Sequence, residues 1–506
     1  MNEPRENEPR ESGFFGHPKG LATLFSVEMW ERFSFYGIRP LLILYMIEGL
    51  KEGGFGFERP YAAAIVGIYA SCVYLTSLPG GWIADRLLGL RRAIWYGGIL
   101  IALGHLSIAL SAFLSHSTFF LGLVLIVLGT GLLKPNVSAI VGDLYPEGGA
   151  RRDAGFSIFY MGINVGATFA PLVTGFLRVQ YGWHIGFGAA GVGMLIGLIT
   201  FRLRAKDTLG ELGTLATGTP DQQKLARNFL TIGGAFIFLM IVLVMTGVIP
   251  FNPLVVAPWM AKVIGTMALA YFAYLFFGAG LSSDEKKRIG VIIVLFFGAV
   301  VFWAAFEQAP TSLNLFAKEF TNRNFFGIEV PPETLQSVNS FMVIVFAPVF
   351  AWLWVALSKR GINPSSPTKF TWALMLAGLG FGIMWIAANK VIAGGAAVRL
   401  SMLWLSASYL LQTFGELSLS PVGLSSMTKL APRRFVGQMM GVWFMAAALG
   451  NLIAGLVGGN IDPNKLEQMP ILFQWTTIWL FIGAAIIGAL IVPIRNMMRE
   501  SSMTSH

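Results

Sequence analysis

The chain has little charge and almost no cysteine for its length. Only 12% of its 506 residues are Asp, Glu, Lys or Arg, about half the usual fraction of a soluble domain, whereas 55% are hydrophobic. Cys72 is the single cysteine, which excludes an intrachain disulfide, and the five histidines have no metal-ligand spacing. No Gly-x-x-x-x-Gly-Lys-Ser/Thr loop is present, so ATP is not expected as an energy source. The composition predicts a multi-spanning membrane protein without metal or cofactor.

The net charge of +10 comes from basic residues in short loops between apolar runs. This placement favours the lipid bilayer over nucleic acid as the surrounding partner. The polar segment 1–13 lacks the apolar core of a cleaved signal peptide. The loops after the even-numbered runs are richer in Lys and Arg, which predicts that both termini are cytoplasmic. The basic residues in these loops are Arg86, Arg91, Arg92, Arg151, Arg152, Arg202, Arg204, Lys206, Lys359, Arg360, Lys429, Arg433 and Arg434.

The apolar runs predict an all-α membrane fold with fourteen transmembrane helices in two six-helix bundles and an inserted pair. We expect a tail (1–20), a first bundle (21–203), a cytoplasmic linker (204–227), the inserted pair (228–280), a second bundle (289–494) and a tail (495–506). This is the layout of the major facilitator superfamily. The segment 81–92, with Gly81, Asp85-Arg86, Gly89 and a basic cluster, resembles the loop motif of that superfamily. A plain positive-inside loop is the alternative.

The first apolar run carries four charges, Glu28, Glu31, Arg32 and Arg39. Each costs about 2.5–3.5 kcal/mol near the centre of a bilayer, even on the gentler insertion scale. Glu28, Arg32, Phe35 and Arg39 share one helical stripe, which is expected to face a polar interior. One interpretation is a structural ion pair that fixes this helix in its bundle. Two acids and two bases exceed that need and favour a site where charges change partners, with protonation of a carboxylate as the switch.

Three later spans each carry a lone charge, namely Lys134, Glu307 and Glu416. Because an embedded charge needs a partner, we expect Lys134 to pair with Glu416 and Arg39 to pair with Glu307. Both pairs would join the two bundles. They are either static ties or two gates that open in turn.

The stretch Glu28-x-x-Glu31-Arg32-Phe33, followed by Tyr36-Gly37, resembles the signature of the proton-dependent oligopeptide transporters. The stretches 131–136, 159–164 and 414–423 are similar to the same family, and the resemblance covers residues 20–495. The extra helix pair is similar to that of bacterial members. The resemblance implies a proton-coupled symporter that imports di- and tripeptides by alternating access across the inner membrane of a bacterium. It implies no required protein partner and no nucleic acid.

A peptide is a zwitterion, so its site needs a cation, an anion and amide partners. Arg39 can bind a carboxylate bidentately, Lys134 adds a second positive charge, and Glu416 would take the amino terminus. The resemblance implies Asn164 and Asn339 as hydrogen-bonding partners. It also implies a pocket lined by Tyr36, Tyr74, Trp303, Phe306, Ser420 and Trp443. Buried amides and aromatics of this kind also serve as helix–helix links and packing.

In this family the carboxylate at the position of Glu307 is associated with proton coupling and the outer gate. The Lys134–Glu416 pair is associated with the inner gate. Together with Glu307, the candidates for proton coupling are Glu28, Glu31 and Arg32.

The sequence departs from the family pattern at three positions. Phe35 replaces a usual tyrosine, Ser340 replaces a proline found in many members, and Gly67 stands where animal members have a histidine. That histidine is thought to take part in proton binding, so coupling is expected to rest on carboxylates here.

Three other functions compete with peptide import as explanations of these residues. A drug/proton antiporter of the same fold fits the aromatics and the carboxylates, but it explains the arginine and lysine less well. A carrier of nitrate or another anion would need little from Glu416. A membrane enzyme is not expected, because we find no nucleophile–base pair and no metal motif.

Overall fold

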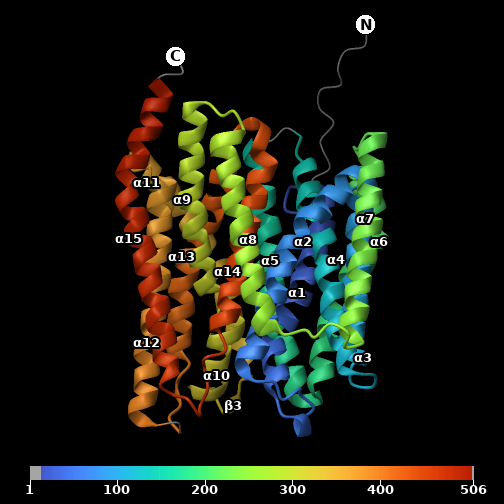
Figure 1. The fold of residues 1–506 in the computed structure, drawn as a ribbon, viewed down its shortest axis with the longest axis vertical. Helices are drawn as coiled ribbons and strands as arrows, with labels where there is room; N and C mark the ends of the chain where they lie inside the picture. Colours follow the sequence, from blue (N-terminus) through green and yellow to red (C-terminus); the bar gives the residue numbers. More distant parts are fainter. Residues whose placement is uncertain (1–12, 147–148, 396, 504–506) are drawn as a thin grey trace. The chain divides into compact units, whose positions relative to one another are not determined.

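The computed structural model describes residues 13–146, 149–395 and 397–503, and helices dominate that part of the chain (Figure 1). The long helices are α1 (Lys19–Ile47), α2 (Arg59–Ile83), α3 (Leu90–Leu110), α4 (His116–Asp143), α5 (Gly149–Tyr181), α6 (Trp183–Leu209), α7 (Pro220–Met245), α8 (Pro253–Ala273), α9 (Ser283–Phe306), α11 (Ser337–Lys359), α12 (Ser366–Gly394), α13 (Leu403–Leu430), α14 (Val436–Val457) and α15 (Gln468–Met503). This confirms the expected all-α fold and its fourteen long helices.

Twelve helical segments of the described chain are long and apolar enough to cross a membrane. The two remaining long helices are α1, which carries the four charges, and α13, which carries Glu416. In a bilayer each backbone amide and carbonyl must be satisfied within the protein, and a helix does this without a partner. Even the shortest of the long helices, the 21-residue α3 and α8, reach about 31 Å, the thickness of the hydrocarbon core.

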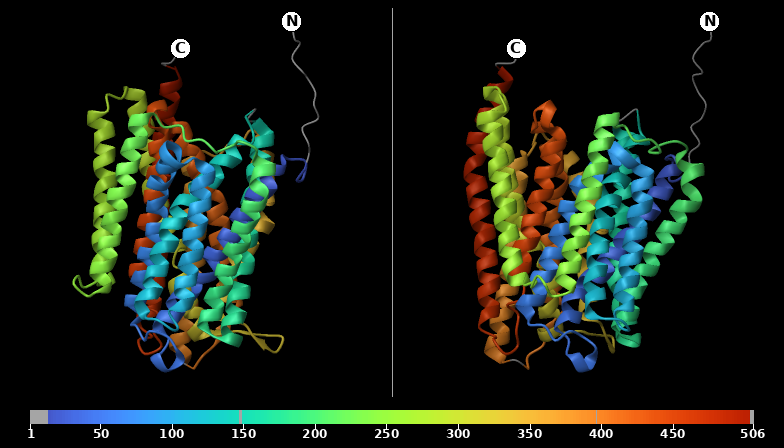
Figure 2. Two further views of the ribbon diagram at one scale, coloured as in Figure 1. Left: turned by 90° about the vertical axis from the view of Figure 1, so that its right-hand side faces the viewer. Right: turned by 45° about the vertical axis from the view of Figure 1, so that its right-hand side comes forward.

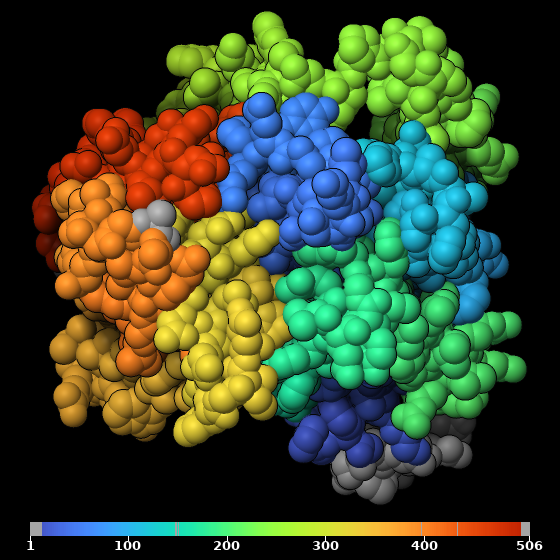
Figure 3. All heavy atoms as spheres, turned by 90° about the horizontal axis from the view of Figure 1, so that it is seen from below, coloured from blue at the N-terminus to red at the C-terminus, as the bar shows by residue number. Residues whose placement is uncertain are grey.

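The short helices and strands of the described residues lie between the long helices. After α9 the chain passes through a π-helical turn, η4 (Ala309–Leu313), into α10 (Asn314–Phe320). Figure 3 looks onto the end of the molecule at which this segment, drawn in yellow, is exposed. There β1 (Thr321–Asn322) pairs in parallel with β4 (Leu400–Ser401). Next to them, β2 (Asn324–Phe325) and β3 (Ile328–Glu329) form a small antiparallel hairpin.

The chain folds into two compact units whose boundaries fall inside α1 and α2. Unit 1 contains the described residues up to Ile38 together with Thr76–Pro250, and unit 2 contains Arg39–Leu75 and the described residues from Phe251 onward. The second part of α1 and the first part of α2 therefore pack with helices from the second half of the sequence. The inserted pair is also divided, with α7 in unit 1 and α8 in unit 2.

In unit 1, α3 packs against α4 and α6, and Figure 2 shows these helices side by side. Facing glycines permit the close approach of α3 and α4. A Cβ atom added at Gly104 would lie 2.7 Å from the carbonyl oxygen of Gly122, and one at Gly97 would lie 2.6 Å from that of Gly129. Small residues at such crossings are typical of membrane helices, because backbones can then touch.

In unit 2, α12 packs against α13 and α15, while α9 packs against α14 and α15. A fully apolar cluster of Ala64, Ala257, Ile264 and Leu452 joins the first part of α2 to α8 and α14. The closest approach is between α2 and α14, where a Cβ atom at Gly67 would lie 2.8 Å from the Cα atom of Gly455. The backbone of α14 therefore leaves no room for a side chain at position 67.

Candidate functional site

The charged stripe of α1 forms a buried three-residue cluster in unit 1. The Arg32 Nε atom lies 3.3 Å from Glu28 Oε1, and the guanidinium also forms an ion pair with Glu31. All three side chains are at least 96% buried. Two carboxylates and one guanidinium carry a net charge of −1, and Lys134 of α4 lies close enough to act on Glu28 electrostatically. The buried Oε2 atom of Glu28 has no hydrogen-bond partner among the described residues. The remaining negative charge can be balanced by the Lys134 cation or, if Lys134 moves away, by a proton on one carboxylate.

The other faces of α1 hold the stripe in place by close packing. Gly193 and Gly197 of α6 lie against the rings of Phe33 and Trp30. Ser34 shares a hydrogen bond with the buried His105 of α3. The Arg32 guanidinium lies over the Phe35 ring, 5.3 Å from its centroid. Position 35 thus contributes a ring face to the arginine without a hydroxyl.

In unit 2, α1 continues with Arg39, whose Nη2 atom donates to Glu307 in a buried ion pair. Glu307 directly follows the last residue of α9, before the π-helical turn η4. The structure thus brings together the two residues that the sequence led us to pair. Next to them, Asn314 Nδ2 donates to the carbonyl oxygen of Pro40 at 2.8 Å.

Two further ion pairs extend this line of contacts toward the loop between α1 and α2. Lys318 Nζ lies 3.0 Å from Glu48 Oε2, and Arg59 Nη2 lies 2.7 Å from Glu319 Oε1. Arg59 also donates to the carbonyl oxygen of Ile461 at 2.9 Å. We call the set Arg39–Glu307, Asn314–Pro40, Lys318–Glu48 and Arg59–Glu319 the α1–α10 contact row. It joins α1 and the start of α2 to the α9–α10 segment within unit 2.

Sequence reasoning missed most of this row. Glu48, Arg59, Lys318 and Glu319 stand at the ends of apolar runs, where charges are normally solvated. The sequence did offer one signal, namely opposite charges near the ends of two runs: acidic Glu48 closes the first run, and basic Lys318 lies beyond the ninth.

A second polar group of unit 2 is centred on Glu416 of α13. Asn339 of α11 donates to Thr413 Oγ1 at 2.8 Å and to Glu416 Oε2 at 3.4 Å. One turn along α13, the buried Oγ atom of Ser420 has no hydrogen-bond partner among the described residues. The same holds for the indole Nε1 of Trp303 on α9. Unpartnered buried polar atoms are uncommon, and a bound ligand is one way to satisfy them.

Aromatic side chains lie near these polar groups in unit 2. The rings of Trp303 and Phe306 meet edge to face, with centroids 5.5 Å apart. Trp443 of α14 packs over Gly423 of α13, and the Tyr74 ring lies 6.5 Å from that of Phe444. Whether these rings line a peptide pocket stays a prediction.

The other expected site residues lie in unit 1. Asn164 of α5 is buried, and its Nδ2 atom donates to the carbonyl oxygen of Tyr160 at 3.0 Å. Tyr36 meets Phe35 edge to face, and Lys134 is half-buried on α4. The pairing of Lys134 in unit 1 with Glu416 in unit 2 stays a prediction. No group of three or more His, Cys, Asp or Glu side chains in the described ranges could hold a metal ion.

The chain is similar to transporters of known family over nearly its whole length. It is 50% identical over 501 residues to the peptide transporter YePEPT of Yersinia enterocolitica subsp. palearctica serotype O:3 (strain YE-P4), with 98% of each chain covered. It is 38% identical over 499 residues to a di-/tripeptide transporter of Lactococcus lactis subsp. cremoris, with 95% of each covered.

Solved structures and a family model agree with these relatives. A crystal structure of a peptide transporter POT in complex with sulfate matches with a TM-score of 0.88 and 40% identity, covering 96% of this chain and 97% of that one. The match confirms the expected fold of the major facilitator type, two six-helix bundles with two inserted helices. The model of the POT family matches residues 91–206 and 261–469. With this match and half of its residues shared with a peptide transporter, the chain belongs to the POT family.

Proposed function

We propose that this protein is a symporter that uses protons to import di- and tripeptides by alternating access. The observation that carries the proposal is the buried Arg39–Glu307 pair, because a guanidinium suited to a peptide carboxylate is held by a side chain that a proton can neutralise. The relatives named for peptides support the substrate class. They do not favour the two rivals, a drug/proton antiporter and a carrier of nitrate or another anion.

In this mechanism a proton from outside neutralises Glu307 and releases Arg39. The carboxylate of the peptide then takes the place of Glu307 on the guanidinium, with Lys134 as a second positive charge. The amino terminus binds Glu416, whose contact with Asn339 holds the carboxylate in position. Ser420 and Trp303 offer the remaining donors to the peptide.

A carboxylate of the Glu28–Glu31–Arg32 cluster is a second site that can take up a proton. When Lys134 turns from Glu28 to the peptide carboxylate, one proton would keep the group of two carboxyl groups and one guanidinium neutral. The two bundles, residues 21–203 and 289–494, rock about the central site. Lys134 and Glu416 separate on the inner side, and the peptide leaves with the proton. The membrane potential supplies about 2.3 kcal/mol per charge per 100 mV.

The proposed setting is the inner membrane of a bacterium, with both termini in the cytoplasm. The loop between α1 and α2 then lies outside. The α1–α10 contact row belongs to the outer end of the transporter, where it ties α1 and α2 to α9 and α10.

The test is uptake of labelled dialanine into proteoliposomes, with and without an inward proton gradient. The wild type should accumulate the peptide under the gradient, whereas Glu307→Gln should exchange peptide for peptide without accumulating it. The control is Glu467→Gln, the same change at an exposed position in the loop before α15, which should behave as the wild type. A wild type that takes up no dipeptide under any gradient would overturn peptide import. Equal accumulation by Glu307→Gln would overturn the proton role of Glu307.

A further inference from the structure

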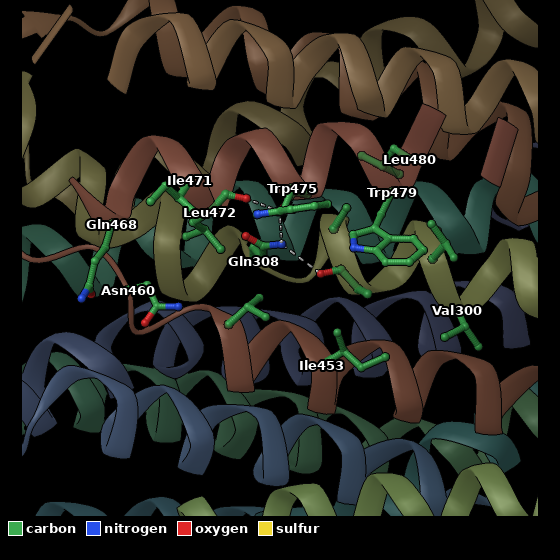
Figure 4. Close-up of a pocket in the computed structure, with 15 residues that line it drawn as sticks. Val300, Gln308, Ile453, Asn460, Gln468, Ile471, Leu472, Trp475, Trp479 and Leu480 are labelled. Atoms are coloured by element: carbon green, nitrogen blue, oxygen red, sulfur yellow. Dashed lines mark hydrogen bonds between the residues drawn. The ribbon is translucent and has the colours of Figure 1, made fainter. Parts of the chain in front are cut away.

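Unit 2 contains a lateral pocket that the transport site does not use. It lies between α9, α14 and α15 and has a volume of about 650 Å³, in the middle of the range of small-molecule sites (Figure 4). None of its fifteen lining residues is charged. A zwitterionic peptide would leave both of its charges unpaired there, so the pocket does not suit the transported substrate.

The lining is polar at one end and apolar along its length. Figure 4 shows Asn460 and Gln468 at one end, beside the connection between α14 and α15, whereas Val300 and Trp479 lie at the other. The stretch of α15 that lines the pocket, from Gln468 to Leu480, spans about 18 Å. This is close to the depth of one leaflet, half of a hydrocarbon core of about 30 Å.

One side of the pocket is open. Along α15, Ile471, Trp475 and Trp479 are 51%, 54% and 58% exposed although they line it. All three helices are long and apolar enough to span a membrane, so the medium expected at the open side is lipid rather than water.

We infer that this pocket binds one acyl chain of a membrane phospholipid. The chain lies along α15 from Ile471 to Leu480, and the ester end meets the side-chain amides of Asn460 and Gln468. Neutral amides suit ester oxygens, and the uncharged apolar wall suits a hydrocarbon chain of one leaflet. With the proposed orientation this is the outer leaflet, since the α14–α15 connection lies on the side opposite the C-terminus.

The inner wall of the pocket is connected to the break between α9 and α10. Gln308, which is only 2% exposed, directly follows Glu307. Its Nε2 atom donates to the Ala304 carbonyl oxygen at 3.2 Å and to Thr476 Oγ1 at 3.3 Å, and its Oε1 atom accepts from Ser312 at 2.9 Å. An acyl chain over this wall shields the Gln308–Thr476 contact, so the lipid holds α15 against the segment that carries Glu307.

The test uses full-length protein in phosphatidylethanolamine liposomes that contain a phosphatidylcholine with a diazirine on one acyl chain. After illumination, the labelled residues are mapped by mass spectrometry and normalised to the label on the exposed surface of α7. Wild-type label should concentrate on residues 468–480 and on the facing residues of α9 and α14. Ala304→Phe, which fills the pocket, should reduce this label by about tenfold. Ala485→Phe, the same change on the exposed face of α15 beyond the pocket, should leave it unchanged.

The proposal would be overturned if the label is distributed along α15 in proportion to exposure and is the same in Ala304→Phe and Ala485→Phe. Protection of the pocket by dialanine would overturn it as well, since the occupant would then be peptide. Val457→Phe fills the pocket from α14 and replaces Ala304→Phe if that variant does not fold. The readout is independent of transport, so it distinguishes failure of the lipid site from failure of the proposed peptide import.

Discussion

At the scale of single residues, the chemistry of this site depends on which charge each buried side chain meets. Arg39 meets a carboxylate of the protein, and Glu416 meets only neutral donors among the contacts described above. In the proposed mechanism Arg39 must be released before it can bind peptide, whereas Glu416 is ready for a cation. The two ends of a peptide are thus treated differently, and only the carboxylate end is coupled to the proton.

Replacement of Glu416 separates peptide import from anion transport. Glu416→Gln keeps the shape and the contact with Asn339 but removes the charge that would hold an amino terminus. We expect dialanine uptake to fall by at least about tenfold, while inhibition by N-acetyl-dialanine, which has no positive charge, is retained. Both quantities are measured in proteoliposomes, as the rate of dialanine uptake and as the inhibition constant of N-acetyl-dialanine. Glu467→Gln is the control at an exposed position, and equal dialanine uptake by the wild type and Glu416→Gln would contradict the assignment.

At the scale of helices, close contact between α2 and α14 explains the glycine at position 67. The backbone of α14 is so near that a methyl group at Gly67 must push the two helices apart. Overpacking of this kind costs about 1–3 kcal/mol. We therefore expect Gly67→Ala to lower the thermal unfolding temperature in detergent. Gly290→Ala on α9, where a Cβ atom would meet nothing within 4 Å, should leave that temperature unchanged or raise it. Equal unfolding temperatures for the two variants would show that α2 and α14 can move apart without loss of stability.

The sequence could predict contacts of charged side chains inside the membrane, but not contacts of neutral amides or of charges near the loops. The partner of Arg39 was predictable because a membrane charge must be paired and Glu307 is a lone acid in its run. The contact between Asn314 and Pro40 was not predictable, because a neutral amide can donate to a carbonyl of its own helix as easily as to one of another helix. Glu48 and Lys318 resembled ordinary loop charges. The lipid pocket was also not predictable from the sequence, because its wall combines side chains of three helices that are far apart along the chain.

At the scale of the molecule, the fourteen helices were predictable from apolar runs, but the two compact units were not. The units divide α1 near its charged stripe, so that Glu28, Glu31 and Arg32 belong to unit 1 while Arg39 belongs to unit 2. A hydropathy pattern cannot show this, since it contains no information about which helix a residue faces. Within unit 2, the α1–α10 contact row joins residues 39–75 to the α9–α10 segment.

If the contact row holds this segment, removal of one ion pair should loosen it. Arg59→Gln removes the contacts with Glu319 and Ile461, and we expect faster amide hydrogen exchange over residues 48–60 and 314–322. The effect should be modest, because Arg59 and Glu319 are both partly exposed and such pairs contribute about 0.2–1 kcal/mol. Arg323→Gln is the matched control, since it makes the same change and removes an ion pair with Glu329 of β3.

The exchange experiment also separates the two interpretations of the row. A gate must open during transport, so loosening it should speed exchange at the outer end while dialanine is still taken up. A static tie would give the same faster exchange together with loss of uptake, because the segment would no longer be held in its working position. If Arg59→Gln and Arg323→Gln show the same exchange rates, the partly exposed ion pairs do not hold residues 39–75. The buried Arg39–Glu307 pair and the α2–α14 packing would then hold that segment.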